Sequence, residues 1–181
     1  MLKNSSKRVC LIVAALSLLQ YGVISAAHRS PQETVREYFS KDLEGARLSA
    51  ETYKAWIAPL ITWKDEPGWD TVFVTKKVYI SKTKQIESSR VAIEVRYENV
   101  GIISGGGGWD ADFLEIRFTE VVEFILVRQG VEWRIQGPVF YPHVSPTRLA
   151  KDLELFMMSQ NEKADGRLQK LKNILKRLKE L

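Results

Sequence analysis

The hydrophobic pattern of this chain changes its period twice, and that order constrains the fold more than any other feature. Between Ser30 and Leu60, apolar residues recur at the three- and four-residue spacing of helices. Between Thr71 and Gln136 they alternate with polar residues, as in half-buried strands, and helical spacing returns after Ser145. Consecutive strands flanked by helices predict an α+β fold with a mostly antiparallel sheet, and they exclude the βαβ order of a parallel sheet.

Two helices are predicted before the strands. Ser30 caps the first helix, Pro31 suits its first turn, and Glu33 completes a capping box. A second helix begins at Ser49, and Pro59 disturbs its end. The predicted apolar positions are Val35, Phe39 and Leu43 in the first helix and Tyr53, Trp56, Ile57 and Leu60 in the second.

At least four strands follow these helices. Alternating or β-branched residues occupy the ranges 71–80, 91–98, 113–128 and 131–136. Between them, the polar segment 81–89 predicts a turn region, and the glycines at 105–108 predict a flexible connection. Gly137-Pro138 ends the last strand.

Residues 1–27 have the pattern of a secretory signal peptide. Three basic residues precede an apolar run over 9–19, and small residues lead to a predicted cleavage site after Ala27. Cleavage would remove Cys10, the single cysteine, and would leave the mature chain secreted or periplasmic. The alternative is an uncleaved membrane anchor, although the apolar run is shorter than the ~20 residues of a typical spanning helix.

The net positive charge is confined to the two ends of the chain. The net charge is +5, whereas the first eight residues alone carry +3 and residues 163–181 carry +5. The remainder is therefore mildly acidic, so the basic pI of 9.3 does not indicate a nucleic-acid-binding domain. A single cysteine excludes the paired cysteines of structural zinc sites. We expect no metal, cofactor or nucleic acid.

The C-terminal segment has a pattern of its own. We divide the chain into a signal peptide (1–27), an α+β domain (28–144) and a C-terminal helical extension (145–181). An amphipathic helix in this extension packs on its own domain, docks on a protein partner, or lies on a membrane surface. Its apolar stripe is formed by Leu168, Leu171, Leu175 and Leu178.

The order and the landmarks resemble the NTF2-like superfamily, which includes SnoaL-type and ketosteroid-isomerase-type proteins. The resemblance spans residues 30–140 and depends on the opening Ser30-Pro31-Gln32-Glu33-Thr34-Val35 and on the strand Gly130-Val131-Glu132-Trp133-Arg134-Ile135. It implies a cone, with N-terminal helices packed on a strongly curved sheet and a cavity between them. The family includes isomerases, dehydratases, ligand binders and non-catalytic domains. The histidine–aspartate pair of its dehydratases has no evident counterpart, because only His28 and His143 remain after cleavage.

Glu120 is the candidate for acid–base chemistry. Period two places it on the same face of its strand as Leu114, Ile116, Phe118, Val122, Phe124 and Leu126. A carboxylate in an apolar row has a raised pKa and can act as a general base, with Tyr97 as a hydrogen-bond donor. The alternatives are a bulge at residues 120–122 that turns Glu120 to solvent, or a salt bridge to Arg96 or Arg134.

Three functions agree with these patterns. The preferred one is a non-catalytic protein that binds a small apolar ligand or a protein partner and forms a homodimer through the sheet. The second is a cone-pocket isomerase, dehydratase or hydrolase that uses Glu120, and the third is an envelope assembly or scaffold component. The predicted ligand-binding residues, which would otherwise be simple core residues, are Tyr53, Trp56, Trp63, Phe118 and Trp133.

Overall fold

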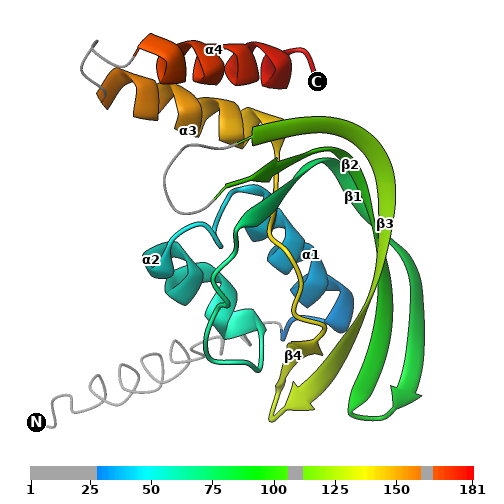
Figure 1. The fold of residues 1–181 in the computed structure, drawn as a ribbon. Coiled ribbons are helices and arrows are strands. Elements are labelled where there is room, and N and C mark those ends of the chain that lie inside the picture. The colour runs from blue at the N-terminus through cyan, green and yellow to red at the C-terminus, as the bar shows by residue number, and fades with distance from the viewer. Residues whose placement is uncertain (1–27, 106–111, 160–164) are drawn as a thin grey trace, which may run out of the picture.

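The computed structural model describes residues 28–105, 112–159 and 165–181 (Figure 1). The predicted signal peptide and most of the glycine run at 105–108 lie outside these residues. Among the described helices, none combines the length and the apolar character that a membrane span requires.

The order of elements confirms the α+β prediction. Helices come first, strands follow, and two further helices end the chain (Figure 1). The segment after Ser49 is α-helical for one turn and then continues as a π-turn and a 3-10 turn that contains Pro59. The elements are α1 (Pro31–Leu43), α2 (Ala50–Thr52, continued by turns to Leu60), β1 (Thr71–Glu87), β2 (Arg90–Ser104), β3 (Asp112–Gln129), β4 (Glu132–Gly137), β5 (His143–Val144), α3 (Pro146–Ser159) and α4 (Asp165–Lys179).

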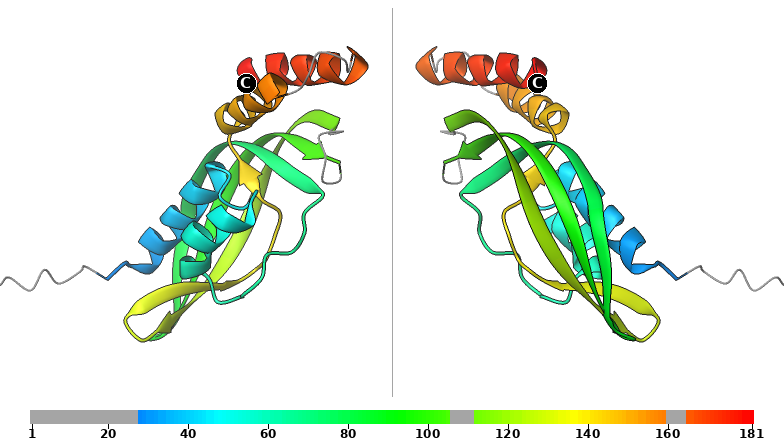
Figure 2. Two further views of the ribbon diagram at one scale, coloured as in Figure 1. Left: turned by 90° about the vertical axis from the view of Figure 1, so that its left-hand side faces the viewer. Right: turned by 90° about the vertical axis from the view of Figure 1, so that its right-hand side faces the viewer.

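The five strands form one strongly curled sheet in the order β4-β3-β2-β1-β5. Neighbouring strands are antiparallel, except that the short β5 runs parallel to β1. Helices α1 and α2 lie within the concave side of the curl, and α3 and α4 cover one end of it (Figure 2). This arrangement is consistent with a cone.

The prediction of a turn region over residues 81–89 is wrong. Strand β1 continues to Glu87, and only residues 88–89 form the turn into β2. The polar side chains of this stretch pair across the hairpin, as Lys82 does with Glu94 at 3.6 Å. This part of β1 is an edge of the sheet and its side chains are exposed on both faces, so its sequence has the polarity of a loop.

The capping box of α1 is confirmed, but its buried face is offset from the prediction. Ser30 Oγ accepts a hydrogen bond from the backbone N–H of Glu33, and Glu33 Oε2 accepts one from the N–H of Ser30. Phe39 and Leu43 are only partly buried. The buried side chains are Thr34, Val35, Tyr38 and Asp42, so a carboxylate faces the core.

A bulge in β3 changes which side chains share a face. Phe118 pairs with Asn99 and Glu115 with Gly101, so β3 has one more residue than β2 in this interval. Leu114 and Ile116 were predicted to lie on the buried face, but they are therefore 58% and 44% exposed, respectively. Beyond the bulge the prediction is correct, because Val122, Phe124 and Leu126 are buried and share their face with Glu120.

The outer edge of the sheet is protected against a further strand. Strand β5 pairs only with Phe73 and Val74 of β1, so the rest of β1 has no partner on that side among the described residues. Lysines and register shifts on an edge strand oppose edge-to-edge association. This part of β1 carries lysines at 76, 77, 82 and 84 and three register shifts against β2.

Two clusters of apolar residues form the core. The first lies inside the curl, between α1, α2 and the sheet, and includes Tyr38, Ile57, Tyr97 and Phe124. The second joins α3 and α4 to the far end of the strands. Of the predicted leucine stripe, Leu171 and Leu178 are buried in this second cluster, and Leu168 and Leu175 are partly buried. The stripe therefore packs largely on its own domain.

Candidate functional site

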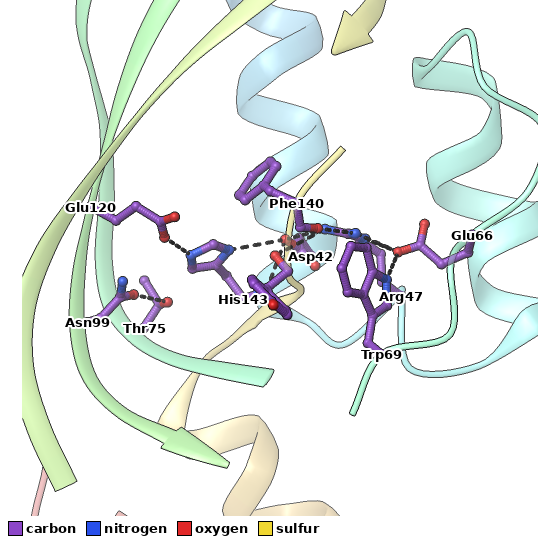
Figure 3. A network of polar contacts seen from close by, with 10 residues as sticks. Asp42, Arg47, Glu66, Trp69, Thr75, Asn99, Glu120, Phe140 and His143 are labelled. Carbon is purple, nitrogen blue, oxygen red and sulfur yellow. Dashed lines mark hydrogen bonds and ion pairs between the residues drawn. The ribbon is translucent and has the colours of Figure 1, made fainter. Parts of the chain in front are cut away.

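An ion-pair network crosses the interior of the curl. We call it the central network, and its members are Asp42, Arg47, Glu66, Glu120 and His143 (Figure 3). They come from α1, the segment after α1, the segment before β1, strand β3 and strand β5, respectively. Residues far apart in the sequence thus meet at one place.

His143 is the centre of this network. The last strand predicted from sequence ends at Gly137-Pro138, before His143, but β5 pairs with β1 and the imidazole is completely buried. Its Nε2 lies 2.9 Å from Oε2 of Glu120. An ionised carboxylate only accepts hydrogen bonds, so Nε2–H is the donor whenever Glu120 is ionised. Glu120 therefore binds a histidine, and neither Arg96 nor Arg134.

Asp42 lies on the other side of the imidazole. Its Oδ2 accepts a hydrogen bond from the backbone N–H of His143 at 3.1 Å and lies 3.9 Å from His143 Nδ1. Arg47 Nη1 approaches the same oxygen at 3.5 Å. A histidine and an aspartate are therefore neighbours here, although nothing in the local sequence pattern pairs them.

Arg47 connects the network to the chain around it. Its guanidinium donates to Glu66 Oε1 and to the carbonyl oxygens of Phe140 and Tyr141. Trp69 Nε1 donates to the same Glu66 oxygen. The side chain of Arg47 is fully buried, so this one residue holds two carboxylates and the segment that leads into β5.

Aromatic rings fill the space around His143. The Tyr97 ring stacks on the imidazole with centroids 4.1 Å apart, and Phe140 and Phe73 lie 5.2 Å and 5.3 Å away. Burial raises the pKa of Tyr97 well above its ordinary value, so this phenol stays neutral. Tyr97 is opposite Glu120 across the strands, but its hydroxyl has no hydrogen-bond partner among the described residues.

The network holds more carboxylates than cations. Arg47 faces Asp42 and Glu66, and His143 faces Asp42 and Glu120. Burial raises the pKa of the Asp42 carboxyl above its ordinary value of 3.8, and Arg47 and His143 oppose that rise. An ionised Asp42 is thus held in place by its partners at a cost in desolvation.

A pH-dependent stability difference is expected for Asp42→Asn. The pKa of Asp42 is higher in the folded chain than in the unfolded chain, where it is near 3.8. Protonation of Asp42 therefore stabilises the fold. This stabilisation is complete below the unfolded pKa and is lost as the pH rises through the folded pKa. The free energy of unfolding of the wild type should therefore decrease relative to that of the variant between pH 4 and 7. Urea titrations across this range measure the difference. If the wild type instead gains stability relative to the variant as the pH rises, burial is not the main influence on the pKa of Asp42.

The structure does not bring the predicted ligand-binding aromatics into one pocket. Trp63 and Trp133 pack against the first core cluster. Trp56, Tyr53 and Phe118 line three separate surface cavities of about 450, 320 and 330 Å³. Neither Glu120 nor His143 lines any of these cavities. The described residues also contain no group of three or more metal-ligating side chains placed to hold an ion.

Four members of the central network were absent from the sequence prediction. Asp42 was detectable, because it follows Tyr38 by four residues and so occupies the same face of α1. His143 and Arg47 lie in irregular or very short segments, where periodicity carries no information. Glu66 lies in a sequence typical of turns, which predicts that its side chain is exposed to solvent. Only Glu120 was found, from its place in an apolar row.

Comparisons of the chain with protein-family models, with curated proteins and with solved structures found no match. The fold and the central network are therefore the observations on which a function has to be based.

Proposed function

We propose that this chain is a non-catalytic NTF2-like binding protein, secreted or periplasmic. One observation carries the proposal: the imidazole of the acid–base pair, which a cone enzyme would expose to its substrate, is enclosed. His143 has no accessible surface, and the rings of Tyr97, Phe140 and Phe73 lie against it. An acid–base catalyst has to reach its substrate within hydrogen-bond distance. The surface cavities, in contrast, are open to ligands.

The reactivity of the two histidines tests this proposal. His28 is exposed and serves as an internal control. With diethyl pyrocarbonate, we expect His28 to react in the folded protein and His143 to react at least about tenfold more slowly until urea unfolds the chain. Peptide mass spectra measure both rates, and spectra of the exported protein show whether it begins at His28. Equal rates in the folded protein would refute the enclosed site.

An acid–base enzyme is the second candidate. The observation that favours it is the 2.9 Å contact between His143 and Glu120, whose side chain is 27% exposed. Glu120 could then exchange protons with solvent on behalf of a buried imidazole. This function requires the aromatic rings to move apart, so a reactive His143 in the folded protein would support it over the first.

A further inference from the structure

A surface cavity next to Trp56 lies apart from the central network. It forms where the end of α1, the helical segment of α2 and the start of α3 meet, and its volume is about 450 Å³. Small-molecule sites have volumes of roughly 300–1,000 Å³. We call it the Trp56 cavity. The lining residues that matter here are Lys41, Glu44, Thr147, Trp56, Arg148 and Lys151.

The apolar wall of this cavity is the indole ring of Trp56. The residue is 52% exposed, although Ile57 and Tyr53 next to it are buried. Lys41 Nζ lies 5.0 Å from the centroid of the ring, at the distance of a cation–π contact. A flat apolar surface with a cation beside it suits an aromatic ring that carries a negative charge.

The charges around the cavity favour an anion. Three basic side chains line it, against one carboxylate. Lys41 pairs with Glu44 at 2.8 Å, and Arg148 pairs with Asp152 at 2.9 Å from outside the lining. Lys151 is exposed and has no ion-pair partner among the described residues. One ammonium group is therefore free to bind an anionic group, next to the exposed hydroxyl side chain of Thr147.

We propose that the Trp56 cavity binds a small aromatic carboxylate, with the ring against Trp56 and the carboxylate at Lys151. The inference depends on the proposed binding function and deepens it by naming a site and a ligand class. It differs from the expectation of a small apolar ligand in naming an anionic one. A neutral aromatic compound lacks the partner for Lys151, and inorganic phosphate lacks the ring.

Titration calorimetry with 1-naphthoate tests the site. We expect one molecule to bind per chain, and the neutral isostere 1-naphthamide to bind at least about tenfold more weakly. Lys151→Glu and Trp56→Ala should each weaken 1-naphthoate binding by about tenfold. The matched control is Lys54→Glu, which makes the same charge change on an exposed lysine that lies on the segment of Trp56 but outside the cavity lining, and it should leave the affinity unchanged.

Three results would overturn the proposal: equal affinities for naphthoate and naphthamide, equal effects of Lys151→Glu and Lys54→Glu, or no binding of naphthoate. Because Trp56 and Lys151 are exposed, all three variants should fold, which their circular dichroism verifies. The histidine-reactivity experiment is independent of these outcomes. A protected His143 without naphthoate binding would refute this site alone, and a reactive His143 would refute the enclosed cone.

Discussion

Replacing Arg47 with methionine is expected to lower the free energy of unfolding by about 3–5 kcal/mol, because a buried carboxylate pair loses its counterion. The guanidinium is enclosed between Asp42 and Glu66, and it also donates to the carbonyl oxygens of Phe140 and Tyr141. Methionine keeps much of the volume but none of the five donors. Urea unfolding of the variant and of the wild type at pH 7 measures the loss.

Two further variants show whether charge is the cause. Arg96→Met removes a partly exposed arginine 3.8 Å from Glu94 and should change stability by no more than about 0.5 kcal/mol. Adding Asp42→Asn and Glu66→Gln to Arg47→Met should recover most of the loss, because the uncompensated charges are removed with their partner. A triple variant as unstable as Arg47→Met would show instead that packing and the two carbonyl contacts dominate.

The elements of this fold could largely be predicted from sequence, because caps, turns and period-two alternation are local signals. The capping box at Ser30 and the α+β order are examples. The bulge in β3 was not predictable by alternation. A bulge bends its strand, and this one lies opposite the stretch of β2 between Asn99 and Gly101. At Gly101 an added Cβ would lie 2.3 Å from the ring of Phe113.

The central network could not be predicted for a different reason. Asp42 and His143 are 101 positions apart, and each contradicts the rule that charged residues face solvent. Burial of either residue becomes acceptable only when the other is in place, so the position of Asp42 on the buried face of α1 does not reveal its partner. Glu120 was found because its neighbours on β3 are apolar, which is a local signal.

Phe124→Ala is expected to cost about 3–5 kcal/mol of stability, since it opens a cavity inside the first core cluster. Phe124 has no exposed surface and makes edge contacts with Tyr38 at 5.6 Å and with Phe140 at 5.3 Å. The matched control is Val121→Ala on the same strand, where the side chain is 50% exposed, and the expected change is within about 0.5 kcal/mol. Urea unfolding measures both.

This substitution also separates a filled cone from a ligand cavity. If aromatic rings fill the interior, benzene has no site in the wild type and should leave its unfolding midpoint unchanged. In Phe124→Ala the same ligand has a new apolar cavity to occupy and should raise the midpoint, because binding to the folded state alone stabilises it. Stabilisation of the wild type by benzene would mean that the cone already holds a cavity. The ligand site of this protein would then have to be sought beside His143 and Phe140, where the rings meet.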